Sequence, residues 1–510
     1  MAEKKVVVIG AGIGGLTAAL ELGHLGLDVT VIERGAVAGG KVAAEWVNGQ
    51  PIDSGPTVFT MRWVFDELLD SVGLRLDREL KLKPLNTLAR HFWADGSALD
   101  LHADPLASEA AIEAFAGAQE AENFRKFCDT TRALYGVMDA AFIRAQRQNL
   151  PSFMASLGPR GLALLTRIGP MKTLWSSLQT QFTDPRLRQL FARYATYCGS
   201  SPWQAPATLS LIAQVEMDGV WSVEGGMVEL AQCLTRLCQQ VGVRFRFQTH
   251  CEHISVKNGK VAGVQLSTQE QLPADRVIFN GDAAALRQGL LGAPAQKAVA
   301  ATPAPRSLSA VTWALHAKTQ GLALDRHNLF FWPDYASEFQ DIFERQQLPK
   351  QPTVYLCAQD RQDQQAPAGP ERLLCLVNAP ATGDQQALSD QSLAQCEAQC
   401  LTLMQQCGLS LELTPHNHVV STPQKFHHRF PATGGALYGQ ATHGWMSIFS
   451  RPGAQSALPG LYLSGGSVHP GPGVPMAAMS GRLAAAAVRA SLGLTKTFPV
   501  GATSGGMSTP

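Results

Sequence analysis

The chain has 510 residues, of which 45% are hydrophobic and 16% charged, a composition that excludes a disordered or fibrous protein and predicts a globular one with two or three lobes. The 42 Lys and Arg residues nearly balance the 41 Asp and Glu residues, so the formal net charge of +1 gives no general attraction to nucleic acid, and we expect no nucleic-acid partner. The sequence contains no run of about eighteen apolar residues, so we predict no membrane-spanning helix. Its ten cysteines include no CxxC pair, which favours reduced thiols over disulfides or a metal site.

The first predicted elements form a nucleotide-binding unit. A buried strand at Lys5–Ile9, which we interpret as a strand and not as part of a signal peptide, leads into a turn with the sequence GAGIGG at 10–15. A helical run at 16–26 and a second strand at 28–33 follow, and that strand ends in the acid Glu33. The glycines permit a tight bend, a close approach to a pyrophosphate and close packing of helix on strand, while the helix N-terminus offers free N–H groups to phosphates. This order predicts a dinucleotide-binding domain in which Glu33 binds a ribose.

The residues after Glu33 decide between the two common dinucleotides. Arg34 follows directly, and a second glycine pair with a cation, Gly39-Gly40-Lys41, precedes the turn DSGPT at 53–57. A glycine pair beside a cation suits a long cofactor whose ribityl chain runs past the first strand. The pattern resembles the superfamily of flavin-dependent amine oxidases and carotenoid desaturases, and this resemblance implies FAD. Lys41 stands where many members have arginine, which keeps the charge but loses the guanidinium fork.

A basic stretch comes next, at 141–196. It holds one acid, Asp184, and eight cations, which are Arg144, Arg147, Arg160, Arg167, Lys172, Arg186, Arg188 and Arg193. Apolar residues such as Phe153, Leu165 and Trp175 are interleaved with them. Basic residues beside apolar anchors on amphipathic helices are typical of docking on an anionic membrane; the alternative is a solvated basic face over an ordinary core. We expect 141–196 to be a helical membrane-facing segment of a peripheral protein on the cytoplasmic side.

The segment 219–290 is expected to return to the cofactor. It is interpreted as a turn, an amphipathic helix, a hairpin around Asn258-Gly259 and a strand at Arg276–Phe279. In the resembled superfamily such a block completes the FAD domain, and the backbone at the position matching Cys251 faces the adenine. The alternative for Gly225-Gly226 is an ordinary pair of loop glycines.

Other segments resemble one subgroup of the superfamily. FTDPRLR at 182–188 and GPGVP at 471–475 are typical of carotenoid desaturases, not of amine oxidases. The segments that resemble the 1-hydroxycarotenoid 3,4-desaturases (methoxyneurosporene dehydrogenases) of purple photosynthetic bacteria are RHN at 326–328, FF at 330–331, DY at 334–335, EF at 338–339 and PTVYLCAQDR at 352–361. The resemblance covers nearly the whole chain. It implies an enzyme of carotenoid biosynthesis that converts the carbon 3–carbon 4 single bond of an acyclic 1-hydroxycarotenoid into a double bond, with hydride transfer to FAD.

The C-terminal part contributes the last cofactor segment and candidate substrate contacts. Pro475 suits the first turn of a small-residue helix whose N-terminus we expect to face the flavin. A site that bonds the substrate hydroxyl would discriminate strongly against a hydrocarbon. The candidates for that contact, each of them alternatively a turn or surface residue, are His427, His428, Thr433, Tyr438 and His443. No second GxGxxG turn follows a strand, so we expect electrons to leave to oxygen or a quinone, and we expect the tail at 497–510 to be disordered.

We therefore predict an α/β fold in which a discontinuous, Rossmann-type FAD-binding domain joins a mixed α+β substrate lobe. The FAD-binding domain takes 1–95, 221–290 and 425–490, and the lobe takes 96–220 and 291–424. The residues expected at the cofactor are Gly10, Gly12, Ile13, Gly14, Gly15, Glu33, Arg34, Gly40, Lys41, Gly55, Pro56, Thr57, Cys251, Gly466, Gly473, Val474 and Pro475. No catalytic base and no metal site is predicted. The alternatives are a phytoene-type desaturase acting on an unhydroxylated carotene, a flavin-dependent carotenoid isomerase and a flavin-binding scaffold without turnover.

Overall fold

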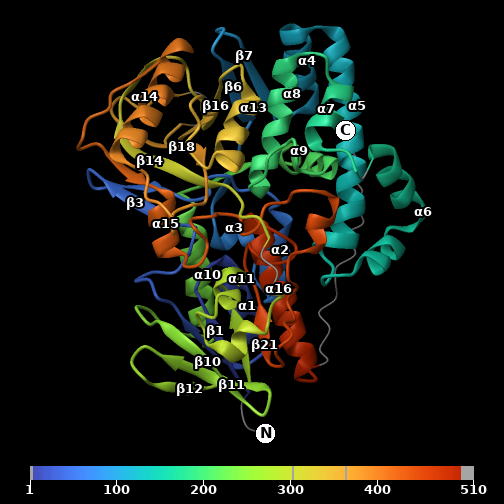
Figure 1. Ribbon diagram of the computed structural model, residues 1–510, viewed down its shortest axis with the longest axis vertical. Helices are drawn as coiled ribbons and strands as arrows, with labels where there is room; N and C mark the ends of the chain where they lie inside the picture. Colours follow the sequence, from blue (N-terminus) through green and yellow to red (C-terminus); the bar gives the residue numbers. More distant parts are fainter. Residues whose placement is uncertain (1–3, 170, 301–303, 362–364, 495–510) are drawn as a thin grey trace.

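The computed structural model describes residues 4–169, 171–300, 304–361 and 365–494. These residues form two halves, one built on a parallel sheet that carries the N-terminal glycine turn and one built on a larger mixed sheet (Figure 1). A group of helices from α4 (Pro105–Ala116) to α9 (Leu211–Met217) lies beside the larger sheet (Figure 1). The tail predicted to be disordered, 497–510, lies outside the described residues.

The parallel sheet has five strands drawn from distant parts of the chain. In order across the sheet they are β21 (Leu461–Leu463), β13 (Arg276–Phe279), β1 (Lys5–Ile9), β2 (Asp28–Ile32) and β9 (Arg244–Arg246). Val6 and Val8 of β1 pack on the helix side, where α1 (Ile13–His24) contacts α10 (Val228–Gln240) and α16 (Val474–Ser491). Val7 packs on the opposite side. The strand is a continuous apolar run because both of its faces are covered.

A three-stranded antiparallel sheet covers the opposite side. Its strands are β10 (Cys251–Lys257), β11 (Lys260–Leu266) and β12 (Gln271–Pro273), and Ile254 and Val264 share a core cluster with Val7. The turn between β10 and β11 consists of Asn258 and Gly259, whose φ angles are 50° and 74°. Two positive φ values in a two-residue hairpin loop explain the Asn-Gly pair, and the predicted hairpin is confirmed.

The second half is built on a seven-stranded mixed sheet. In order across it the strands are β20 (His418–Ser421), β14 (Ser309–Ala317), β18 (Glu371–Ala379), β17 (Val354–Ala358), β16 (His327–Phe331), β6 (Thr87–Trp93) and β7 (Ala98–His102). Only β16 and β6 pair in parallel among these neighbours. Helix α14 (Asp390–Gln406) packs on the outer face through a core that joins Leu403 to Trp313 and Leu356. The inner face is left for the cavity described below.

One predicted domain boundary differs from the structure. The first FAD-binding segment was expected to end at residue 95, yet β6 belongs to the seven-stranded sheet and residue 95 lies in the turn that joins β6 to β7. Trp93 donates its backbone N–H to Ser97 across this turn, at 3.0 Å. The boundary therefore falls before β6, because a hairpin cannot be divided between two sheets that lie apart.

The helical segment includes α5 (Ala118–Met138), α6 (Leu150–Ile168), α7 (Leu174–Gln181) and α8 (Pro185–Ala192). Stacked aromatic side chains, among them Phe127, Phe182 and Phe191, join α5 to α8. Helix α6 stands at the edge of the molecule (Figure 1). Among the described residues, no helix combines the length and apolarity that crossing a bilayer requires.

The eight cations of 141–196 do not share one face. Those that form ion pairs are Arg144 with Glu67 and Asp139, Arg186 with Asp184, and Arg193 with Glu216. Arg147 and Arg188 donate to backbone carbonyls. Arg160, Arg167 and Lys172 are exposed and form no ion pair with the described part of the chain. The basic surface is therefore smaller than the sequence predicts, because five of the eight cations serve the fold.

The remaining elements are short and connect the sheets. They are β3 (Ala44–Val47), β4 (Gln50–Asp53), α2 (Trp63–Ser71), α3 (Leu76–Glu79), β5 (Leu82–Pro84), β8 (Trp221–Val223), α11 (Ala283–Arg287), α12 (Ala293–Gln296), β15 (Thr319–Gly321), α13 (Tyr335–Phe339), β19 (Leu409–Leu411) and α15 (Pro423–Arg429).

Candidate active site

A cavity of about 850 Å³ lies between the two halves. Its one end is lined by the glycine turn and by the starts of α1 and α16, and its other end by the inner face of the seven-stranded sheet and by α5 and α9. All the residues expected at the cofactor line it, with the exception of Gly15. The sequence-predicted set is therefore brought together in one place, although its members span residues 10–475.

The glycine turn shapes the first end of the cavity. Gly10 has a φ of 99°, which favours glycine. A Cβ on Gly14 would lie 2.8 Å from the carbonyl oxygen of Ala477, so glycine is needed for α1 and α16 to meet here. Gly15 lies behind the wall, where a Cβ would come within 2.2 Å of the carbonyl oxygen of Gly10. It serves helix packing, while the free N–H groups of the first turn of α1 are placed for a phosphate.

Glu33 and Arg34 stand at the end of β2, where an adenosine ribose is expected. The Glu33 carboxylate accepts the backbone N–H groups of Ala11 at 2.8 Å and of Gly35 at 2.6 Å, which fixes it against the glycine turn. The Arg34 guanidinium donates to the carbonyl oxygen of Arg429 at 2.6 Å and so ties this strand end to α15. Cys251 lines the cavity close to this region with Thr249 and His250.

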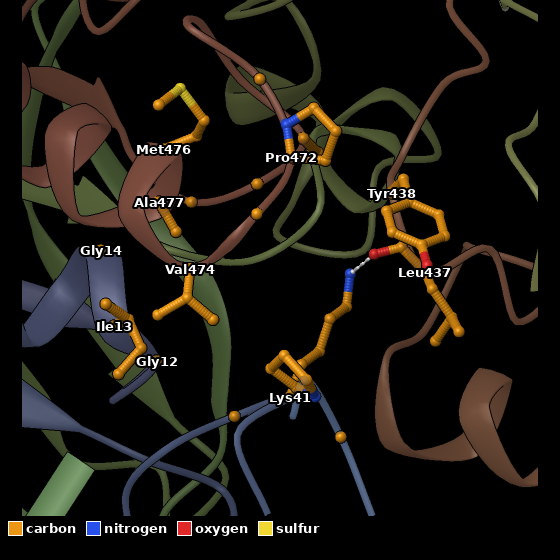
Figure 2. A pocket seen from close by; sticks show the side chains of 18 of the residues that line it. Gly12, Ile13, Gly14, Lys41, Leu437, Tyr438, Pro472, Val474, Met476 and Ala477 are labelled. Carbon is orange, nitrogen blue, oxygen red and sulfur yellow. Dashed lines mark hydrogen bonds between the residues drawn. The ribbon is translucent and has the colours of Figure 1, made fainter. Parts of the chain in front are cut away.

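Lys41 is a half-buried cation in the wall. Its Nζ donates to the carbonyl oxygen of Leu437 at 2.5 Å and lies 5.3 Å from the centre of the Phe430 ring (Figure 2). Burial lowers the pKa of Lys41, with the nearby Asp282 carboxylate acting in the opposite direction. A Cβ on Gly55 would lie 1.9 Å from the carbonyl oxygen of Lys41, so the two predicted cofactor loops are in direct backbone contact.

The N-terminus of α16 faces the same space. Gly473, with a φ of 111°, precedes Val474 and Pro475 at the first helical positions. Val474 and Ala477 lie opposite Ile13 and Gly14 of α1, so that two helix N-termini border one cavity (Figure 2). Their positive dipole ends favour the negative charge of a pyrophosphate and of a reduced flavin.

The turn after β13, Asn280-Gly281-Asp282, is a part of the site to which the sequence assigned no role. All three residues line the cavity. Asn280 donates from Nδ2 to the carbonyl oxygen of Gly10 at 3.2 Å and accepts from the Ser464 hydroxyl at 3.2 Å. It therefore joins the ends of β1, β13 and β21. Its position directly after a parallel strand is the sequence feature that could have identified it as a cofactor-site residue, because ligands bind at the carboxyl ends of such strands.

The other end of the cavity is largely apolar. Across the sheet, neighbouring strands bring Thr312, Leu376, Tyr355 and Leu329 into one row, and all four line the cavity. The Tyr355 hydroxyl bonds to Thr57 at 2.6 Å and to Nδ1 of His327 at 2.7 Å. Burial, aided by nearby arginine charges, lowers the pKa of His327 to about 3, so this histidine is neutral.

A buried ion pair stabilises the helical side of this wall. Arg193 donates to Glu216 at 3.0 Å, and the hydroxyls of Tyr194 and Tyr197 donate to the same carboxylate. Arg193 and Tyr197 line the cavity, but their charge and hydrogen bonds are directed to Glu216. The sequence grouped Arg193 with membrane-facing cations, because no local pattern shows that a glutamate 23 residues later is its partner.

The five predicted substrate contacts do not gather around the cavity, and only Tyr438 lines it. His427 accepts a backbone N–H from Gly434, Thr433 donates to the carbonyl oxygen of Phe430, and His428 is exposed. His443 accepts the N–H of Ser201 and packs on Phe343. The side chains of His427, Thr433 and His443 bond to loops beside the site, and none of the four residues lines the cavity, so the expectation that 427–443 holds a cluster of hydroxyl contacts is wrong for them.

Comparisons with known proteins agree with this geometry. Residues 13–489 match the family described as flavin containing amine oxidoreductase. The hydroxyneurosporene desaturase of Rubrivivax gelatinosus is 55% identical over 508 residues, which cover 99% of this chain and 97% of the relative. The 1-hydroxycarotenoid 3,4-desaturase of a Flavobacterium species is 32% identical over 94% of this chain and 98% of its own. A putrescine oxidase structure with bound putrescine, 15% identical, covers 96% of this chain and 99% of its own with a TM-score of 0.61, a likeness of fold alone.

Proposed function

The chain belongs to the flavin-containing amine oxidoreductase family, and we propose that it is an FAD-dependent desaturase that introduces the carbon 3–carbon 4 double bond into an acyclic 1-hydroxycarotenoid. The observation that carries this proposal is the similarity to hydroxyneurosporene desaturase along 99% of the chain. A cavity that runs from the glycine turn to an apolar wall supports it, because such a cavity suits a dinucleotide and a polyene end to end.

The residues at the first end of the cavity fit FAD. The glycine turn and the two helix N-termini would hold the pyrophosphate, Glu33 the ribose, and the loops at Lys41 and Gly55 the ribityl chain and ring. Bound there, FAD supplies the two-electron acceptor for a hydride. The half-buried cation of Lys41 and the N-terminus of α16 would favour the negative charge that the ring gains.

The substrate itself lowers the need for a strong acid or base. Carbon 4 is allylic to the polyene, so the positive charge left by loss of a hydride spreads along the conjugated chain, and a proton then leaves carbon 3. The protein's contribution is to hold carbon 4 in place and to exclude water. The wall is suited to this role because Leu329, Leu374 and Leu376 are apolar, and because the charges of Arg193 and Glu216 are paired with each other.

We propose that the enzyme docks on an anionic membrane through the surface around α6 and the short helix Trp445–Phe449. Met171, next to Lys172 in the loop after α6, is 83% exposed, and Met446 of the short helix is 44% exposed. Arg160 and Arg167 of α6 are exposed as well. Phe153 of α6 packs on Phe449, whose neighbour Ile448 lines the cavity. A lipid-soluble substrate would then enter from the cytoplasmic face of the membrane.

Changing Arg160, Arg167 and Lys172 together to Glu tests the docking. We expect binding to anionic liposomes to weaken while FAD is retained, since these exposed cations make no ion pairs with the described residues. A charge-matched control changes the exposed Lys83, Lys257 and Lys260 to Glu and leaves liposome binding intact. Equal binding by the two triple variants contradicts the docking surface.

Product analysis tests the reaction. Purified, FAD-loaded enzyme in liposomes is given 1-hydroxyneurosporene, neurosporene or phytoene, with oxygen or a quinone, the two acceptor classes that we propose, to reoxidise the flavin. Conversion of the hydroxylated substrate to a product with one more conjugated double bond supports the proposal. Conversion of the hydrocarbons alone indicates a phytoene-type desaturase, a rearranged product without net oxidation indicates an isomerase, and no product from any substrate indicates a scaffold.

A further inference from the structure

The hydroxyl of Tyr335 is a polar group that the fold leaves unused. The Tyr335 side chain is 5% exposed and lines the cavity, yet its hydroxyl forms no hydrogen bond with any residue that the structure describes. The hydroxyls of two other cavity-lining tyrosines bond to the protein, Tyr197 to Glu216 and Tyr355 to Thr57. A hydroxyl that lines a cavity without a protein partner is available to bond a ligand there.

A second polar group lies beside it. Glu338 is 1% exposed, and no cation pairs with it among the described residues. Its carboxyl accepts from the Thr353 backbone N–H at 3.0 Å, from the Thr353 hydroxyl at 2.6 Å and from the Asn378 amide at 2.8 Å. Thr353 and Asn378 line the cavity, whereas Glu338 lies behind them and does not line it. The carboxyl therefore fixes the orientation of two cavity-facing side chains.

These groups belong to one cluster. Tyr335 and Glu338 are three residues apart on α13 and so share a face of the helix. Thr353 and Asn378 stand opposite each other, two residues beyond the paired Tyr355 and Leu376. Burial, and next the charge of Glu338, raises the pKa of Tyr335, which keeps its hydroxyl protonated and able to donate.

The cluster lies at a suitable distance from the reacting carbons. Tyr355 bonds to Thr57, next to the Gly55-Pro56 turn of the cofactor site. Thr353 lies two residues before Tyr355, directly ahead of β17, and both line the cavity. Residues two apart in extended chain are about 7 Å apart. In the substrate, four single bonds of about 1.5 Å join the hydroxyl oxygen to carbon 4, so the two atoms are at most about 5 Å apart.

We propose that Tyr335, Thr353 and Asn378 form the subsite that binds the tertiary hydroxyl of the substrate, an inference that rests on the proposed function. When Glu338 is ionised, the Thr353 hydroxyl directs its proton to that carboxylate, so its lone pairs face the cavity as acceptors. The Tyr335 hydroxyl is a donor. A free alcohol satisfies both groups, a methyl ether satisfies only Tyr335, and a hydrocarbon satisfies neither. The subsite therefore prefers the alcohol over the ether and the ether over the hydrocarbon.

The test compares kcat/KM for 1-hydroxyneurosporene, its methyl ether and neurosporene in FAD-loaded enzyme. Tyr335→Phe removes one oxygen atom, and we expect the preference for the alcohol over the hydrocarbon to fall about tenfold, the value of one hydrogen bond. Thr353→Val removes the acceptor, so the preference for alcohol over ether should fall by a similar factor. Tyr438→Phe is the matched comparison, since Tyr438 is the other cavity-lining tyrosine whose hydroxyl has no partner among the described residues.

The outcomes separate the subsite from the reaction. If both Tyr335→Phe and Thr353→Val keep the wild-type preferences, or if Tyr438→Phe alone abolishes them, the subsite is assigned wrongly although the reaction stands. If the wild-type enzyme does not desaturate the hydroxylated substrate, the proposed function itself fails. Should Tyr335→Phe lose FAD, Thr353→Val alone decides, by the change in its preference for alcohol over ether.

Discussion

The buried carboxyl of Glu338 is expected to make the stability of this protein depend on pH. Burial raises the pKa of Glu338 from 4.5 to about 7, although the hydrogen bonds from Thr353 and Asn378 act in the opposite direction. The folded protein therefore holds this proton more tightly than the unfolded chain does. As pH rises from 4.5 through 7, the unfolded chain loses the proton first, and stability falls over that window.

Glu338→Gln removes the titration and keeps the size of the side chain. At about 1.4 kcal/mol for each pKa unit, the raised pKa of the wild-type carboxyl corresponds to a loss of about 2.5 kcal/mol in the free energy of unfolding between pH 5 and pH 8. The variant does not suffer this loss. We therefore expect its stability relative to wild type to increase by about 2.5 kcal/mol over that range.

Urea unfolding of the FAD-loaded proteins, followed by tryptophan fluorescence at several pH values, measures the difference. Asp341→Asn is the control, because hydrogen bonds from Arg345, Gln347 and Lys350 outweigh burial and hold the pKa of Asp341 below its usual range. Its effect should stay constant from pH 5 to pH 8. A constant difference between wild type and Glu338→Gln over the same range would refute the reasoning.

Three further changes test the core of the site. Gly481→Val should lose FAD, measured as flavin absorbance per protein, because a Cβ at Gly481 lies 2.2 Å from the carbonyl oxygen of Gly14 and forces α16 from α1; normal flavin content would contradict this. Arg193→Met should destabilise the protein by about 3–5 kcal/mol in urea unfolding, because Glu216 is left buried without its cation, and adding Glu216→Gln should recover most of the loss. Lys41→Gln should weaken FAD binding about tenfold in ultrafiltration, because a half-buried charge in the wall of the cofactor site is lost; an unchanged Kd would remove Lys41 from the site.

The nucleotide half was predictable because its signals are local. A glycine turn between a buried strand and a helix has one physical use, and the α/β fold, the family and FAD, all expected from the sequence, are confirmed. The far wall was harder to predict. Asn378 and Thr353 meet only because β17 and β18 pair, and the partner of Arg193 is set by how α9 packs.

The candidate substrate contacts show the same limit. His427 and His443 are polar residues close in sequence to a cofactor segment, but loop hydrogen bonds use their side chains. Tyr335 and Glu338 lie in segments that the sequence already marked as characteristic of one subgroup, yet nothing local showed that Tyr335 lines the cavity or that Glu338 holds the cavity-lining Asn378. Alternation along β18 gave a hint, since Leu374, Leu376 and Asn378 share one face of the sheet.

The central claim is that this enzyme removes hydrogen from carbons 3 and 4 of a hydroxylated polyene and transfers the electrons to FAD. An anaerobic single turnover with 1-hydroxyneurosporene in liposomes, following flavin bleaching and the carotenoid spectrum together, tests it most directly. The account predicts that the flavin bleaches at the same rate as the polyene bands shift to the red by one conjugated double bond. A polyene change without bleaching, or neither change with this substrate while neurosporene or phytoene gives both, would contradict it.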